Sequence, residues 1–163
     1  MSERPIWAPW RIEYITGEKP AGCVFCAAAR GEGDDSARVL ERGRRCFAML
    51  NAFPYASGHT MLVPYRHVAD LLALDQDELD DLLHLTRRSV RALTAVMSPE
   101  GFNVGLNLGE AAGAGIAEHL HMHVVPRWAG DTNFMPVLAD THVLPQALDA
   151  ARDALTAALA ELS

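Results

Sequence analysis

One short run constrains the fold more than any other part of the chain. Residues 119–127 read HLHMHVVPR, so histidine alternates with apolar residues before the run becomes apolar and reaches a proline. Side chains of a β-strand point alternately to opposite faces. The alternation therefore predicts a strand in which His119, His121 and His123 share one face. Neighbours on such a face are roughly 6.5–7 Å apart, so one phosphate group can contact more than one imidazole.

Three imidazoles in a row leave three interpretations open from the residues alone. They can be the solvent-facing side of an edge strand, the ligands of a metal ion, or the centre of a nucleophilic site. A buried row is costly unless each ring has a polar partner. We favour nucleophilic catalysis, because imidazole is largely neutral near pH 7 and its ring nitrogen can attack phosphorus or a carbonyl carbon.

The other elements follow from periodicity and from the placement of glycine and proline. The segment after Asp75 is the clearest helix, because Asp75 and Glu78 form a capping-box pattern before leucines at helical spacing, and Pro99 ends it. The remaining expectations are a short helix at Val24–Arg30, strands at Ala37–Arg42, Arg45–Asn51, His59–Pro64, 102–109 and 119–127, and a helix at Leu144–Leu162. This order predicts an α+β fold with a mostly antiparallel five-stranded sheet, a long helix and a C-terminal helix.

Length and composition narrow the class of protein. A chain of 163 residues is most simply one domain, 1–163, with residues 1–22 as an N-terminal arm. It has no apolar run of the ~20 residues that a membrane span needs and no secretory signal pattern. Three cysteines, an odd number, argue against a disulfide framework and favour the reducing cytoplasm. A net charge of −7 argues against a nucleic-acid polymer as partner but allows a small anionic ligand.

The triad run resembles the signature of the histidine triad (HIT) family, in which histidine and apolar residues alternate and two apolar residues follow. The segment RCFAMLNAFPYASGHTMLVPYRHV is similar to the region upstream of that signature, and GLNLGEAAGAG is similar to the approach to its phosphate loop. WAPWR near the N-terminus and the run from Gly101 to Phe134 are most like the bacterial diadenosine tetraphosphate phosphorylase and hydrolase branch. The resemblance implies a homodimeric enzyme that forms a nucleotidyl-histidine and cleaves dinucleoside polyphosphates at the α-phosphate, by phosphorolysis or hydrolysis.

The resemblance also implies roles for individual residues. His121 takes the place of the nucleophile, and His123 and His59 take the places of its phosphate-contacting partners. The positions that match substrate-binding residues are Asn51 for the ribose, Asn107 for the phosphate, and Gly113, Ala114 and Gly115 for backbone amides that bind phosphate oxygens. The chain departs from the pattern at Gly115 and Ile116, where many relatives carry Gln-Ser or Gln-Thr. Hydrogen bonds to the phosphate oxygens at this position would therefore come from backbone amides or water.

The motif CVFC at residues 23–26 is a weak signal alone, because a zinc site needs two further ligands. Relatives with this cysteine pair bind zinc. The resemblance therefore implies a structural Zn²⁺ site made of Cys23, Cys26, His67 and His119. The alternative is a pair of unbound thiols.

Two other functions remain open at this point. One is an adenosine phosphoramidase-type HIT hydrolase, which would cleave a P–N bond. The other is a non-catalytic nucleotide-binding protein that keeps the triad as a ligand pocket.

Overall fold

The computed structural model describes residues 22–33, 38–131 and 147–162. Its strands form one sheet in the order β1-β2-β3-β5-β4, and all neighbouring strands are antiparallel. The strands are β1 (Val39–Arg42), β2 (Cys46–Leu50), β3 (Thr60–Pro64), β4 (Gly101–Leu106) and β5 (Met122–Arg127). The α-helices are α2 (Val24–Arg30), α3 (Gln76–Met97) and α5 (Leu148–Glu161), with short 3₁₀ turns η2 (Leu71–Ala73) and η3 (Glu110–Ala112). The predicted α+β fold is confirmed, whereas the predicted N-terminal arm lies outside the described residues except for Gly22.

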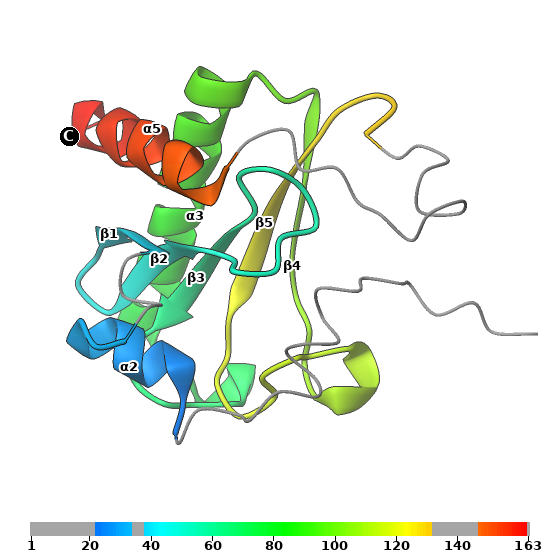
Figure 1. Ribbon diagram of the computed structural model, residues 1–163. Helices are drawn as coiled ribbons and strands as arrows, with labels where there is room; N and C mark the ends of the chain where they lie inside the picture. Colours follow the sequence, from blue (N-terminus) through cyan, green and yellow to red (C-terminus); the bar gives the residue numbers. More distant parts are fainter. Residues whose placement is uncertain (1–21, 34–37, 132–146, 163) are drawn as a thin grey trace, which may run out of the picture.

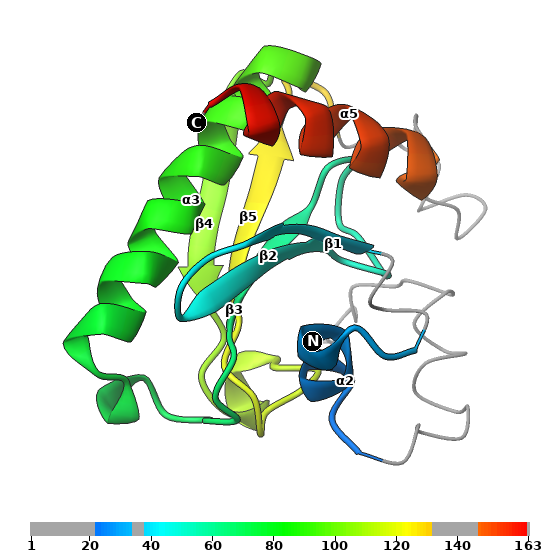
Figure 2. The ribbon, with the colours of Figure 1, turned by 90° about the vertical axis from the view of Figure 1, so that its left-hand side faces the viewer.

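The middle strands of the sheet are covered on both faces. Cys46, Ala48 and Leu50 of β2 belong to the main core, which α3 and α5 complete. Phe47 and Met49 point the other way, into a smaller core that includes Phe25 and Ala28 of α2. Figures 1 and 2 show the same arrangement, with α3 and α5 on one side of the sheet and α2 on the other. The helix that carries the cysteine motif is thus packed against the central strands.

Helix α3 has the predicted start. The backbone N–H of Glu78 donates to the Asp75 carboxylate at 2.8 Å, and the N–H of Asp75 donates to the Glu78 carboxylate at 3.0 Å, which completes the capping box. At 22 residues it is the longest described helix, but its outer face is charged. Within the described ranges, no helix has the length and apolar character that a bilayer crossing requires.

The strand that carries the triad is shorter than predicted. It begins at Met122 rather than at residue 119, so His123 alone of the three histidines lies in the regular strand. The strand begins there because Met122 is the first residue of β5 that pairs with either neighbouring strand, β3 or β4. Before that point the Leu120 N–H donates to the Val68 carbonyl at 2.7 Å instead. The three rings therefore do not form an evenly spaced row on one strand face.

Candidate active site and metal centre

The histidine with the most restricted chemistry is His121, which is only 7% exposed. Its Nδ1 lies 2.9 Å from the backbone carbonyl oxygen of His119. A carbonyl can only accept a hydrogen bond, so Nδ1 carries the hydrogen and Nε2 carries the lone pair. Burial lowers the pKa of His121 more than this hydrogen bond raises it, which favours the neutral ring. The result is a neutral imidazole with one nitrogen fixed as donor and the other able to attack.

A second pair of rings is ordered by a chain of hydrogen bonds. The backbone N–H of Tyr55 donates to Nδ1 of His59 at 3.1 Å, so this nitrogen is an acceptor. In the neutral ring the hydrogen then stands on Nε2 of His59, which donates to Nδ1 of His123 at 2.9 Å. Nε2 of His123 consequently carries a hydrogen and is a donor. The ring of His123 lies 4.9 Å from that of His121, so this donor belongs to the same site.

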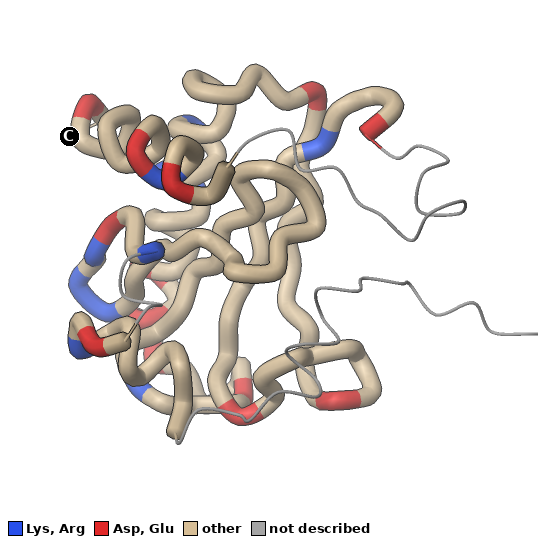
Figure 3. Tube along the Cα trace, in the orientation of Figure 1, with Lys and Arg blue, Asp and Glu red and all other residues tan. Residues whose placement is uncertain are grey.

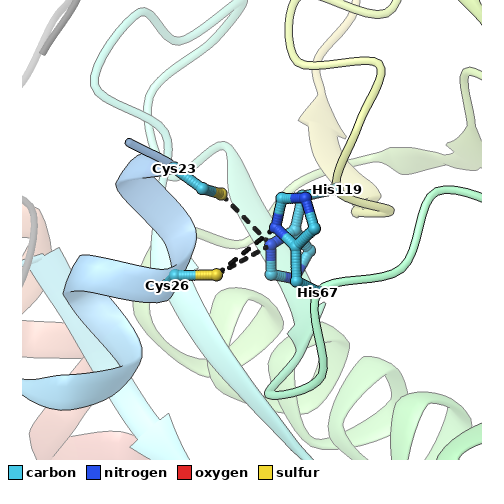
Figure 4. Close-up of side chains that lie close together, drawn as sticks. All are labelled: Cys23, Cys26, His67 and His119. Atoms are coloured by element: carbon cyan, nitrogen blue, oxygen red, sulfur yellow. Dashed lines mark hydrogen bonds between the residues drawn. The ribbon is translucent and has the colours of Figure 1, made fainter. Parts of the chain in front are cut away.

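Two cysteines and two histidines from three separate segments come together beside the triad. Sγ of Cys23 lies 3.2 Å from Nδ1 of His119, and Sγ of Cys26 lies 3.6 Å from the same nitrogen and 3.4 Å from Nδ1 of His67. All four ligand atoms lie within 4.8 Å of one another. Figure 4 shows both sulfurs pointing from α2 toward the two rings. The four predicted ligands are therefore placed where one ion could bind them all.

The distances fit a tetrahedral zinc ion. With Zn–S bonds of ~2.3 Å and Zn–N bonds of ~2.05 Å, adjacent sulfur and nitrogen ligands are about 3.6 Å apart. The tautomer also fits, because Nε2–H of the fully buried His119 donates to the Pro64 carbonyl at 2.9 Å and leaves Nδ1 for a metal. Burial lowers the pKa of His119, which keeps the ring neutral. Burial and the neighbouring Cys23 thiol raise the pKa of Cys26, so the thiolate that binds a metal is harder to form. The charge of a bound cation offsets this cost.

The two predicted substrate-binding asparagines lie next to different parts of the histidine site. The side-chain oxygen of Asn51 accepts from the Phe53 N–H at 2.8 Å, and its nitrogen lies 3.5 Å from Nδ1 of His59. Asn107 is half-buried, directly after β4. Asn51 thus lies beside His59, and Asn107 follows Leu106, which pairs with Met122 between His121 and His123, but their contacts with a substrate remain predictions.

The predicted phosphate loop is only partly available to a ligand. The N–H of Gly113 donates to the Glu110 carbonyl at 2.9 Å, and the N–H of Ala114 donates to the Gly109 carbonyl at 3.3 Å. These two amides close the turn around η3. Gly115 is the one of the three predicted residues whose amide has no hydrogen bond to another described residue. The loop as placed here therefore offers one amide to an anion rather than three.

Two aromatic residues that sequence reasoning did not assign to the site contact its histidines. Tyr55 stacks on His59, with ring centroids 5.1 Å apart and an interplanar angle of 17°, and its amide orients that ring. Phe25 lies between the two cysteines in the chain and packs against the rings of His119 and His121. An aromatic residue within the turn before Gly58 was the available signal for Tyr55. No local signal in CVFC indicates that its phenylalanine reaches the triad.

Together these features define a class, namely compact α+β domains that present a neutral, buried histidine beside further imidazole donors on one face of an antiparallel sheet, here the face that α2 covers. The HIT domain family model matches residues 32–130, and the chain belongs to the histidine triad family. It is 40% identical over 151 residues to a Mycobacterium tuberculosis protein named AP-4-A phosphorylase, covering 88% of this chain and 77% of the relative.

Solved structures agree with this assignment. A Zn-bound histidine triad family protein from Mycobacterium smegmatis is similar with a TM-score of 0.71 and 27% identity, covering 86% of this chain and 95% of that one. A HIT family protein from Bacillus anthracis is similar with a TM-score of 0.62 and 27% identity, covering 69% and 77% of the two chains. The recognition of the family from the triad run is therefore confirmed.

Proposed function

We propose that this protein is a nucleotidyl-histidine enzyme that cleaves dinucleoside polyphosphates, diadenosine tetraphosphate first, at the α-phosphate. The observation that carries the proposal is the neutral His121 ring, whose Nδ1–H is held by the His119 carbonyl so that Nε2 keeps its lone pair. The relative named AP-4-A phosphorylase supports the choice of substrate. The net charge of −7 does not oppose an anionic ligand here, because the histidine and amide donors are local.

The reaction proceeds in two displacements at the α-phosphorus. In the first, the lone pair of His121 Nε2 forms a P–N bond, and the bond from phosphorus to the bridging oxygen breaks. The leaving nucleotide, ATP in the case of diadenosine tetraphosphate, takes that electron pair. In the second, an oxygen of inorganic phosphate or water forms a new bond to phosphorus, and the P–N electrons return to Nε2. The product is ADP with phosphate as acceptor and AMP with water.

The surrounding residues bind and orient the substrate. His123 donates from Nε2 to a phosphate oxygen, and His59 keeps His123 in that tautomer. The Gly115 amide and the Asn107 side chain add donors near the scissile bond, and Asn51 contacts the ribose. These positions contribute by placing the phosphorus in line with Nε2 and by stabilising the charge that develops on its oxygens.

Zinc is the metal proposed for the Cys₂His₂ cluster. Four protein ligands close a tetrahedral coordination shell, so the ion would be structural and would tie α2 to the residues around the triad. The name of the Zn-bound relative from M. smegmatis supports this choice. Metal-binding thiols persist in a reducing compartment, which is consistent with the proposed cytoplasmic location.

A homodimer is the proposed assembly, formed through β4 at the edge of the sheet. Exposed edge strands usually carry charged residues that prevent pairing. β4 carries none along its length, as Figure 3 shows. Val104 on this strand is 49% exposed and Leu108 just beyond it is 48% exposed. Light scattering should give about twice the chain mass of 17.7 kDa, and Val104→Lys should shift it toward the monomer; a wild-type monomer would contradict the proposal.

The decisive test of the activity is His121→Asn, with His84→Asn on the exposed side of α3 as the matched control. The first variant should lose turnover of diadenosine tetraphosphate by at least about 1,000-fold, and the control should keep it. Radiolabelled substrate should leave an acid-labile, base-stable adduct on the wild type and none on His121→Asn. Near-wild-type activity of His121→Asn would remove the proposed nucleophile.

Product analysis assigns the acceptor and separates the other candidate functions. ADP that forms only when inorganic phosphate is present indicates a phosphorylase, and AMP with or without phosphate indicates a hydrolase. Faster turnover of adenosine phosphoramidate than of diadenosine tetraphosphate would favour the phosphoramidase. Binding of nucleotide without adduct or product would favour the non-catalytic nucleotide-binding protein.

A further inference from the structure

The phenylalanine of the cysteine motif, Phe25, packs against two histidines of the triad. Phe25 is 2% exposed. Its ring centroid lies 5.4 Å from that of His119 at an interplanar angle of 78°, and 5.0 Å from that of His121 at 47°. Aromatic rings attract one another at such separations. One side chain therefore contacts both a predicted metal ligand and the proposed nucleophile.

We propose that Phe25 is a positioning residue for the His121 ring, and that a metal ion in the Cys₂His₂ cluster holds Phe25 there. This inference rests on the proposed function, in which His121 is the nucleophile. Phe25 stands between Cys23, the N-cap of α2, and Cys26 in its first turn. A helix of 7 residues is not stable by itself, so α2 depends on its contacts for its position. Binding of both sulfurs to one ion would fix both ends of the four-residue segment that carries the ring.

A second contact leads from the cluster to the same imidazole through the backbone. The ring of His119 is held at Nε2 by the Pro64 carbonyl, and its Nδ1 faces the sulfurs. The carbonyl of the same residue accepts the Nδ1–H of His121. Fixing the His119 ring therefore also restrains the group that sets the His121 tautomer. The ring of Phe25 and the carbonyl of His119 both contact the His121 ring, and both belong to segments that carry ligands of the Cys₂His₂ cluster.

The His121 ring needs this support because it has few other restraints. Within the described residues its one hydrogen bond is to the His119 carbonyl, and that bond still allows the ring plane to tilt. The other ring contact is with His123, at 4.9 Å and 73°. A misplacement of ~1 Å at the reacting atom can cost about 100-fold in rate. The His59 ring is oriented separately, by the Tyr55 N–H at Nδ1 and by its own hydrogen bond to His123, so it serves as an internal reference that metal loss should leave unchanged.

The first test compares two changes inside the same motif in the full metal-loaded chain. Phe25→Ala should lower kcat for diadenosine tetraphosphate by about 10-fold to 100-fold with KM within about twofold. Phe25→Leu, which keeps apolar volume so that the fold survives, should lower kcat less but still beyond twofold. The matched control is Val24→Ala, because Val24 packs against the same small core without a ring contact to the triad. It should keep wild-type kcat, and zinc content per chain should be equal in all four proteins.

The second test needs no substrate. Nitrogen-15 spectra of the histidine rings should assign His121 to the Nδ1–H tautomer in the zinc-loaded wild type. Phe25→Ala, or removal of zinc from the wild type, should broaden or shift the His121 signals and leave those of His59 in place.

Three results would overturn the positioning role. These are wild-type kcat in either Phe25 variant, a loss confined to KM, and His121 signals that neither change affects. Failure of the proposed function looks different, because the wild type would then form no adduct. The ring spectra would still test the positioning of His121 in that case.

Discussion

One guanidinium joins α3, α5 and β1 beside their shared apolar core, and its removal gives a prediction with a calculable size. Arg88 on α3 donates to both carboxylate oxygens of Glu41 at 2.8 and 3.0 Å. It also donates to the carbonyls of Leu159 and Leu162 at the end of α5, at 2.7 and 3.1 Å. The last carbonyls of an α-helix lack their usual partner four residues on, and the Leu159 carbonyl otherwise accepts only from the Leu162 N–H at 3.2 Å. One side chain therefore closes a helix end and neutralises a carboxylate.

The magnitude follows from burial. The Arg88 and Glu41 side chains are only 15% and 21% exposed, so the pair lies between a surface ion pair worth ~0–1 kcal/mol and a buried one that costs ~3–5 kcal/mol to break. Hydrogen bonds from a charged donor to the two carbonyls add to the loss. We expect Arg88→Ala to lower the free energy of unfolding by about 3 kcal/mol. For a chain of this length this corresponds to a fall in Tm of about 6–12 °C.

Urea unfolding followed by circular dichroism measures the loss directly. The midpoint of Arg88→Ala should fall while the m-value stays constant, which indicates a change in stability rather than in the surface exposed on unfolding. The matched control is Arg87→Ala, because Arg87 is its exposed neighbour on α3 and should change stability by at most about 0.5 kcal/mol. A loss below about 1 kcal/mol for Arg88→Ala, or equal losses for both variants, would refute the reasoning.

Three further outcomes are expected. The Arg66 guanidinium holds the pKa of Glu78 below its ordinary value, so its stabilisation is present at pH 7 and is lost as pH falls through the lowered pKa. Glu78→Gln, which keeps the capping box, should therefore cost about 1 kcal/mol at neutral pH, since Arg66 is half exposed, and progressively less as the pH falls through the lowered pKa; a cost that does not change with pH would contradict this. Cys26→Ser should contain less than one zinc ion per chain by atomic emission, and a chelator should no longer destabilise it. Cys46→Ala should still bind one zinc ion per chain and should still be destabilised by the chelator. Full zinc content in Cys26→Ser would exclude the cluster as the zinc site. His59→Leu should lower kcat by about 100-fold and His59→Gln should recover part of it, because a glutamine amide can donate to His123; equal rates in the two variants would argue against the hydrogen-bond chain.

The sequence determined the features that depend on neighbours in the chain. The capping-box residues Asp75 and Glu78 were sufficient to place the start of α3, because the hydrogen bonds involved span three residues. The alternation in HLHMHVVPR predicted β5, and the two apolar faces of the sheet follow from the same periodicity of two. The triad motif with the segments around it identified the family, and the cysteine pair together with that resemblance named the four residues of the Cys₂His₂ cluster.

Tertiary structure decided where the strand that carries the triad begins and which nitrogen of each ring holds its hydrogen. Met122 starts β5 because β3 and β4 both stop pairing there, which no pattern inside the run reveals. The tautomer of His119 depends on the carbonyl of Pro64, 55 positions away in the chain, and His119 lies 96 positions from Cys23. The contact between Phe25 and His121 likewise joins residues that are far apart in the chain. Local propensity acts over a few residues, whereas the approach of distant side chains is set by how the sheet and its two layers of helices close upon one another.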